Sequence, residues 1–180
     1  MKNSKTLDLT KIALMAAVTA IMAQLAIPMP AGVPMTLQTL AVILSGVILG
    51  PKLGSISTLI YLLLGAVGVP VFSGLRGGLS MLVGPTGGFI LSFPIMALII
   101  GLGSNLNSKE KYGDFKFWTL IVLGSIINFL IGTIVFCYAT GSSFSAGLTA
   151  CVVPFIPTTI IKTLIGGILG LRIKKAINNN

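Results

Sequence analysis

The sequence predicts an all-α membrane protein built as a bundle of six transmembrane helices, and three observations lead to that fold class. First, 54% of the 180 residues are hydrophobic and 8% are charged, whereas a soluble domain carries about 25% charged residues. Second, charges and clusters of proline and glycine divide the chain into apolar stretches of membrane-spanning length. Third, the basic residues gather between these stretches. The length suits a single integral membrane domain over residues 1–180.

The helices can be assigned in order, because a hydrocarbon core of about 30 Å needs roughly 20 apolar residues for each crossing. The expected helices cover residues 11–27, 35–50, 53–69, 87–103, 117–138 and 149–171. The second is short, and a glycine-rich passage separates the third from the fourth. The basic stretch MKNSKTLDLTK precedes more apolar segments and no polar domain, so we expect it to be a retained tail and not a signal peptide.

The positions of lysine and arginine predict the orientation, since cytoplasmic segments carry an excess of both. With both termini cytoplasmic, ten of the twelve basic residues lie inside: Lys2, Lys5, Lys11, Lys52, Lys109, Lys111, Lys116, Arg172, Lys174 and Lys175. Trp118 then fits an interfacial aromatic belt at the start of the fifth helix. The charge of +9 is therefore a topology signal of a multi-pass protein of the cell membrane. Its spread over four segments argues against a nucleic-acid partner.

Arg76 and Lys162 do not fit this pattern, because both fall toward the outer half. A lysine near the middle of a membrane helix costs about 2.5–3.5 kcal/mol on insertion scales. The three acidic residues, Asp8, Glu110 and Asp114, all belong to cytoplasmic segments, so neither cation has a protein carboxylate nearby. One interpretation is snorkelling, in which the long side chain reaches the interface. The other is that a small anionic ligand supplies the counter-charge.

The composition also limits the chemistry. The chain has no histidine and no carboxylate within the expected helices, so the relays of ion-coupled carriers and the groups of acid–base or metal enzymes are missing. Cys137 and Cys151 are isolated in apolar surroundings and are interpreted as packing thiols. We therefore predict no catalytic residues, no metal site and no cofactor. A protein that binds a solute without such groups needs a partner to supply energy for uphill transport.

The connection between the third and fourth helices is dense in glycine, at positions 74, 77, 78, 84, 87 and 88. Glycine allows positive φ and a close approach of the backbone to a ligand. Irregular backbone at membrane depth is tolerated where it lines a cavity, although an ordinary connector with tight turns explains the glycines as well.

Several motifs in order resemble the BioY family, the biotin-binding S components of energy-coupling factor (ECF) transporters. The motifs are VPMTLQTLAVILSGVILGPKLG, GAVGVPVFSG, GGLSMLVGPTGGF and the PFIP…K segment. The resemblance covers most of the chain. It implies a six-helix S component open to the outside that binds biotin and works with a transmembrane T component and a pair of cytoplasmic ATPases.

Two departures from the family pattern concern the site. The family motif PFxPGDxxK is matched at Pro154, Phe155, Pro157 and Lys162, whereas Thr158 and Thr159 replace its glycine and aspartate. That acid is expected to accept hydrogen bonds from the ureido nitrogens, and a neutral acceptor costs on the order of 1–2 kcal/mol. The GGxGG loop reads GLRGG here. The predicted substrate-binding residues are Lys162, Thr159, Arg76, Gly74, Gly77, Gly78, Gly84, Thr86 and Gln38.

Lys162 lies three positions after Thr159, so both side chains face one side of a helix. Lys162 is predicted to be the counter-charge for the ligand carboxylate, with Thr159 beside it in the pocket wall. Arg76 can donate to a carbonyl or a carboxylate. Gln38 and Asn128 are weaker candidates, because an interhelical hydrogen bond explains one polar residue in an apolar helix equally well.

Small residues on the first helix suggest a docking face. Ala13, Ala16, Ala17, Ala20 and Ala23 recur at helical spacing, and such a stripe suits either packing within the bundle or close contact with a partner helix. The resemblance implies a T-component interface, predicted at Ala13, Ala16, Ala17 and Ala20. The alternatives to a biotin S component are an S component for another small carboxylate vitamin, a solitary membrane facilitator, and a membrane enzyme, which the missing catalytic groups disfavour.

Overall fold

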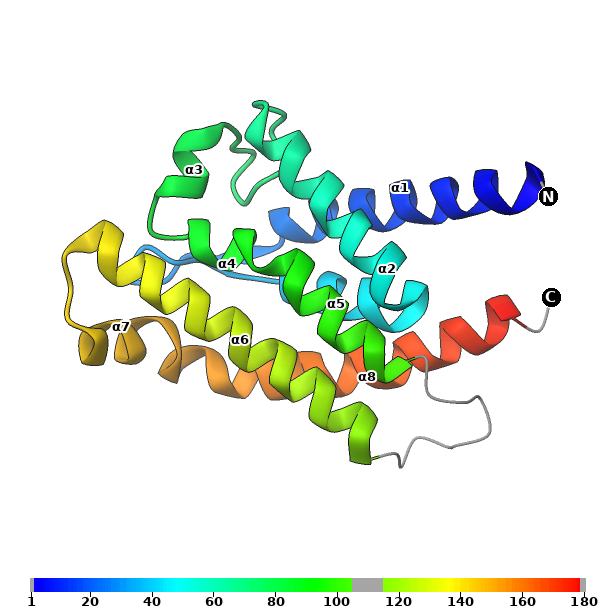
Figure 1. Ribbon diagram of the computed structural model, residues 1–180. Helices are drawn as coiled ribbons and strands as arrows, with labels where there is room; N and C mark the ends of the chain where they lie inside the picture. Colours follow the sequence, from blue (N-terminus) through cyan, green and yellow to red (C-terminus); the bar gives the residue numbers. More distant parts are fainter. Residues whose placement is uncertain (1, 105–114, 179–180) are drawn as a thin grey trace.

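The protein is described by a computed structural model that covers residues 2–104 and 115–178. In chain order the elements are α1 (Lys2–Gln24), β1 (Ala26–Ile27), β2 (Met35–Thr36), α2 (Gln38–Ala66), α3 (Leu79–Val83), α4 (Gly87–Leu91), α5 (Phe93–Ser104), α6 (Phe115–Thr140), α7 (Phe144–Cys151), the 3-10 helix η1 (Val153–Phe155) and α8 (Ile156–Asn178). Figure 1 shows the long helices side by side in one elongated bundle. The strands β1 and β2 form a short antiparallel ladder in which Ala26 pairs with Thr36.

The all-helical membrane class is confirmed by the lengths of these helices. Among the described residues, four helical stretches are long and apolar enough to cross a membrane, at Lys5–Gln24, Gln38–Ala66, Phe115–Thr140 and Phe144–Ile177. Shorter apolar helices, such as Phe93–Ser104, accompany them. The predicted helix 117–138 lies within α6. The predicted helix 11–27 corresponds to α1, which begins earlier, at Lys2. It also ends earlier, at Gln24, because the chain leaves the helix there to form the ladder.

The predicted second and third helices, 35–50 and 53–69, form the two arms of α2. Gly50 has φ +79° and ψ −177°, which no residue inside a helix adopts, and Pro51 follows it without an N–H to donate. The chain therefore bends sharply at this point, where the sequence analysis placed the boundary. The second arm ends at Ala66, which leaves residues 67–78 as a loop before α3.

Two of the predicted helices are each interrupted in the structure, which corrects their predicted extents. The predicted helix 87–103 is two elements, α4 and α5, separated at Ser92. The predicted helix 149–171 is also interrupted: residues up to Cys151 belong to α7, a 3-10 turn follows, and α8 begins at Ile156. Pro154 and Pro157 explain this second break, since proline disrupts a helix interior but is accommodated in a first helical turn.

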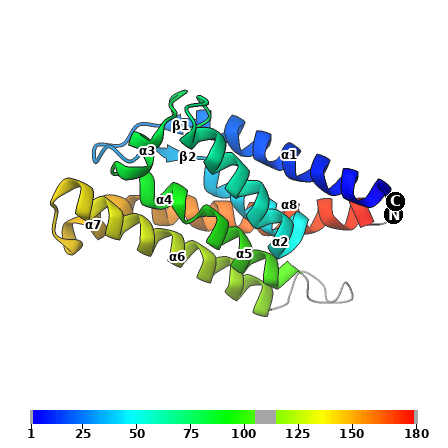
Figure 2. The same cartoon turned by 45° about the horizontal axis from the view of Figure 1, so that its top comes forward.

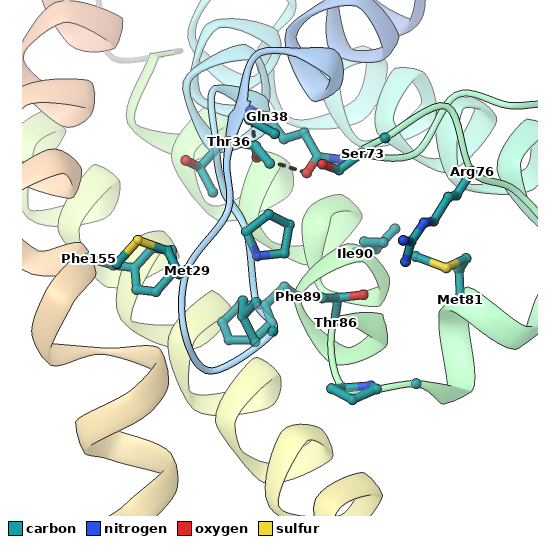
Figure 3. A pocket seen from close by; sticks show the side chains of 18 of the residues that line it. Met29, Thr36, Gln38, Ser73, Arg76, Met81, Thr86, Phe89, Ile90 and Phe155 are labelled. Carbon is teal, nitrogen blue, oxygen red and sulfur yellow. Dashed lines mark hydrogen bonds between the residues drawn. The ribbon is translucent and has the colours of Figure 1, made fainter.

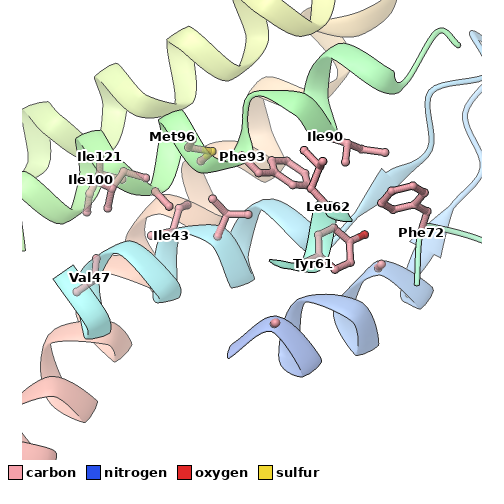
Figure 4. Close-up of a cluster of buried hydrophobic side chains, with 14 of the residues drawn as sticks. Ile43, Val47, Tyr61, Leu62, Phe72, Ile90, Phe93, Met96, Ile100 and Ile121 are labelled. Carbon is pink, nitrogen blue, oxygen red and sulfur yellow. The ribbon is translucent and has the colours of Figure 1, made fainter. Parts of the chain in front are cut away.

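The core forms where α2 packs against α1, α5 and α8, and where α5 packs against α6. Its largest fully buried side chains include Tyr61, Phe72 and Phe93. The rings of Tyr61 and Phe72 meet edge to face with centroids 5.6 Å apart, and Figure 4 shows this pair beside α1. Phe72 lies in the loop after α2 and not in a helix. The core therefore holds one side of that loop in place.

The two ends of the bundle contain different structural elements. Both termini lie at one end, together with the Gly50 bend and the start of α6 (Figures 1 and 2). At this end Lys174 Nζ donates to the backbone carbonyl of Ser104 at 2.6 Å and lies 3.1 Å from Ser104 Oγ. Ser104 is the last residue of α5, so the lysine satisfies a carbonyl that the helix leaves without a partner. The short elements β1, β2, α3 and α7 gather at the opposite end.

Candidate ligand-binding cavity

A cavity of about 700 Å³ opens at the end of the bundle away from the termini. Its walls come from segments far apart in the sequence: the end of α1, the β1–β2 ladder, the 67–78 loop, α3, α4, α6, η1 and α8. Met29, Phe89, Phe129 and Phe155 give it apolar sides, and Figure 3 shows Met29 against Phe155 on one side. The volume lies within the range of about 300–1,000 Å³ that is usual for small-molecule sites.

Lys162 lines this cavity from the second turn of α8. Its side chain is 7% exposed, and its ammonium group donates to the backbone carbonyl of Thr36 at 2.7 Å. Within the described residues no carboxylate forms an ion pair with it; Glu110 and Asp114 lie outside those residues. An ammonium has three donors, so two remain for a ligand. The lysine thus supplies a nearly buried positive charge to the cavity wall.

Gln38 lines the cavity and also forms the interhelical hydrogen bond that was its alternative explanation. Its Nε2 donates to the Tyr61 hydroxyl at 2.6 Å, and that hydroxyl donates to the Val71 carbonyl at 3.1 Å. Its Oε1 accepts from Thr36 Oγ1 at 2.9 Å, a bond drawn in Figure 3. The wall between β2 and the 67–78 loop is therefore one hydrogen-bonded chain.

Asn128 in α6 has an amide whose orientation is fixed by two donated bonds. Its Nδ2 donates to the Phe89 carbonyl at 2.9 Å and to Ser92 Oγ at 2.7 Å, which uses both of its hydrogens. The side chain is 2% exposed, yet it lines the cavity. Its Oδ1 is consequently left as an acceptor. Asn128 was a weaker candidate because an interhelical hydrogen bond explains it equally well, and its bond to Phe89 in α4 is such a bond.

Thr159, Lys162 and Asn128 lie close to one another. All three line a small recess of about 10 Å³ that adjoins the main cavity, together with Thr39 and Ser125. Thr159 is half-buried and lies one helical turn before Lys162, as the spacing predicts. The recess therefore combines a cation, an amide acceptor and a threonine hydroxyl.

The glycine-rich region contributes only part of its residues to the cavity. Gly74, Arg76, Gly84 and Thr86 line it, and Figure 3 shows the exposed Arg76 side chain reaching toward Met81 and Ile90. Gly77 and Gly78 do not line it and instead let the loop pack against its neighbours. A Cβ on Gly77 would lie 2.5 Å from the Val69 carbonyl oxygen, and Gly78 has φ +99° and donates its amide to the Gly65 carbonyl at 2.7 Å.

The alanines of α1 form one stripe that is only partly exposed. Ala16 is 4% exposed and Ala23 is fully buried, both within the core cluster, and Ala20 is partly buried against it. Ala13 and Ala17, toward the other edge of the stripe, are exposed. Packing within the bundle, the alternative given for this stripe, therefore holds for Ala16, and the T-component interface stays a prediction. The surface that can still receive a partner helix contains Ala13 and Ala17.

The fold and the site define a class: a helical membrane protein that holds a small solute in a chamber at one end. A model of the BioY family matches residues 1–179. The biotin transporter BioY2 of Lactococcus lactis subsp. cremoris is 38% identical over 179 residues, covering 99% of this chain and 96% of that protein. A probable biotin transporter BioY of Pyrococcus horikoshii is 38% identical over 170 residues, covering 94% and 98%.

A solved structure agrees with these relatives. The crystal structure of the S-component for biotin from an ECF-type ABC transporter has a TM-score of 0.87 and 30% identity to this chain, covering 97% of it and 94% of that chain. The chain belongs to the BioY family. The predicted resemblance and the S-component fold are thereby confirmed, and family membership places the chain among multi-pass membrane transporters and not among enzymes.

Proposed function

We propose that this chain is the S component of a biotin transporter, which binds biotin in the cavity and passes it inward with an ECF T component and a pair of ATPases. The observation that carries the proposal is Lys162, a nearly buried cation on the wall of a cavity of about 700 Å³. A charge at membrane depth is costly and marks a functional site, here one that can donate charge-assisted hydrogen bonds to a ligand. The second candidate function is a solitary membrane facilitator. A facilitator needs a continuous polar path through the membrane, which the apolar helices α2 and α5 do not offer.

The geometry favours a definite orientation of biotin. Its carboxylate and its ureido group lie at opposite ends of the molecule, whereas Thr159 and Lys162 share one recess with Asn128. One end of the ligand must therefore serve all three residues. We assign the ureido group to the part of the main cavity wall where these three residues lie, because Asn128 Oδ1 and the Thr159 hydroxyl can accept from its N–H groups while Lys162 donates to its carbonyl. A carboxylate there would meet the lone pairs of Asn128 Oδ1.

This orientation leaves the carboxylate near the mouth of the cavity, where Arg76 is exposed. It differs from the pairing of Lys162 with the carboxylate that the sequence suggests. An exposed ion pair contributes little, roughly 0.2–1 kcal/mol, so Arg76 tunes the preference for an acid more than the affinity itself. The apolar side chains Phe89, Phe129 and Phe155 line the space between the two ends.

The membrane arrangement is proposed to have six crossings with both termini cytoplasmic. The two arms of α2 count as separate crossings because of the Gly50 bend. Helix α5 has 12 residues, or about 18 Å, and needs α4 to complete its crossing. We expect cysteines at Lys5 and Lys52 to react only with cytoplasmic reagent and a cysteine at Leu75 to react from outside. Labelling of the Lys52 position from outside would overturn the arrangement.

Two substitutions test the orientation of the ligand. Lys162→Ala removes a charged hydrogen bond worth about 1.5–3 kcal/mol, so the affinity for biotin should fall roughly 10- to 150-fold. It should fall as much for biotinamide, in which the carboxylate is neutralised. Arg76→Gln should instead weaken biotin alone, by roughly 2- to 5-fold, and abolish the preference for biotin over its amide. Equilibrium binding to the purified protein gives all these affinities. If Lys162→Ala abolishes the preference, the ligand lies the other way round.

The ureido acceptors are tested at Asn128. We expect Asn128→Ala to lower biotin affinity roughly 3- to 10-fold, the value of a neutral hydrogen bond. Ser92→Ala is the matched control, since it removes a partner of the Asn128 amide but leaves its Oδ1 in place. Thr159→Asp should tighten binding by supplying a charged acceptor, and in that background Asn128→Ala should cost less. Equal losses in Asn128→Ala and Ser92→Ala would mean that Asn128 only holds α4 and α5 together.

The partner surface is tested on the exposed side of α1. Ala13→Leu and Ala17→Leu should weaken assembly with the T component and leave biotin binding nearly unchanged, because close helix contact needs small residues. Ala146→Leu is the control, as it adds the same bulk to an exposed alanine of α7. Co-purification of the complex and biotin binding by the isolated chain provide the two measurements. Loss of assembly in Ala146→Leu as well would point to a general effect of bulk at the lipid-facing surface.

A further inference from the structure

Gln24, the last residue of α1, holds the tip of the 67–78 loop. Its Nε2 lies 3.3 Å from the Val71 carbonyl oxygen and 3.2 Å from that of Phe72, and it also caps its own helix at Ala20. Its Oε1 accepts from the Leu75 amide at 2.9 Å. One side chain thus uses both its donor and its acceptor to join segments 47–51 residues apart. Nothing in a single sequence links Gln24 to this loop, so its role becomes visible only in the structure.

The loop has firm anchors at its base and few at its tip. At the base, the Phe72 ring packs against Tyr61 and fills the space beside Gly65, where a Cβ would overlap it. Gly78 donates to the Gly65 carbonyl. At the tip, a bridge joins Phe72 to Arg76 within the loop, and Leu75 has φ +55° and is 69% exposed. Within the described residues, the hydrogen bond that reaches residues 73–75 from outside the loop comes from Gln24.

This tip forms part of the cavity wall. Ser73, Gly74 and Arg76 line the cavity, and Figure 3 shows Ser73 beside Gln38 and Arg76 farther along the same loop. Gln24 itself also lines it. A ligand in the cavity is therefore covered on this side by a segment whose position depends on one amide.

We infer that Gln24 is a positioning residue that fastens the 67–78 loop over the cavity and thereby sets the rate at which biotin leaves. The inference rests on the proposed function for the identity of the ligand. Moving the tip away from the cavity breaks the bond to Leu75, while the packing of Phe72 and the bonds from Gln24 to Val71 and Phe72 at the base can persist. Loss of about one net hydrogen bond should raise the population of the open loop roughly 3- to 10-fold.

The test uses the full-length protein in detergent or nanodiscs and the variant Gln24→Met, which keeps the length of the side chain and removes its bonds to the loop. Dissociation of radiolabelled biotin should become roughly 3- to 10-fold faster, and association should not slow. Without ligand, amide hydrogen exchange should accelerate at residues 72–76. Gln24→Glu places a carboxylate oxygen opposite the carbonyl oxygens that accept from Gln24 Nε2, so repulsion should release the loop and dissociation should be at least as fast as in Gln24→Met.

Thr19→Val is the matched control, because Thr19 is fully buried on the same helix and, within the described part of the chain, its hydroxyl bonds to Met15 of α1 and not to the loop. It should change neither rate. Unchanged dissociation in Gln24→Met would overturn the inference, whether or not exchange at the loop accelerates. Equal effects of Thr19→Val and Gln24→Met, or a slower association, would also overturn it by indicating general damage to α1. If the native protein does not bind biotin, the proposed function fails, and an unchanged exchange rate would separately reject the role of Gln24.

Discussion

The cavity end of this protein depends on satisfying backbone carbonyls where the chain is not helical. Apolar surroundings give such groups no water to bond with, so irregular backbone at membrane depth needs partners from the protein. Side chains from the long helices provide them. Lys162 bonds the carbonyl of Thr36, Tyr61 and Gln24 bond that of Val71, and Asn128 bonds that of Phe89. Each bond joins a long helix to a strand, a loop or a short helix at the cavity end, and together they allow a chamber to exist inside a helical bundle.

The same bonds determine what remains for a ligand. Asn128 donates both of its amide hydrogens, one to the Phe89 carbonyl and one to Ser92 Oγ, and presents its oxygen. The Lys162 ammonium uses one donor on the Thr36 carbonyl and keeps two. Because these groups are held before any ligand arrives, little side-chain freedom is lost on binding. In the proposed function, structural support and recognition are therefore carried by the same residues, and a substitution at Lys162 or Asn128 would affect both. This is why controls that remove only the supporting partner, such as the hydroxyl of Ser92, are needed to separate the two roles.

The fold class followed from the sequence because it depends on signals that extend over whole helices: hydropathy, charge placement and the motifs shared with the BioY family. Lys162 and Thr159 could also be predicted as cavity-lining residues, Lys162 because it is a charge in an apolar helix and Thr159 because it lies one turn away. Asn128 and Gln24 were not distinguished, since their importance comes from partners 39 and 47 residues away. The alanines of α1 show a similar limit. Their spacing indicates a stripe, but packing against α2 decides which side of the helix is covered.

Helix α8 is tied to its neighbours by two lysines, one in each half. Lys162 binds the carbonyl of Thr36 and Lys174 binds that of Ser104. Twelve residues separate them, which corresponds to about 18 Å along the axis and roughly a third of a turn around it. Two such points fix both the axial position and the rotational phase of the helix. Any sliding or rolling of α8 must break both bonds or carry β2 and the end of α5 along, so the two ends of the molecule are mechanically connected through a single rigid rod.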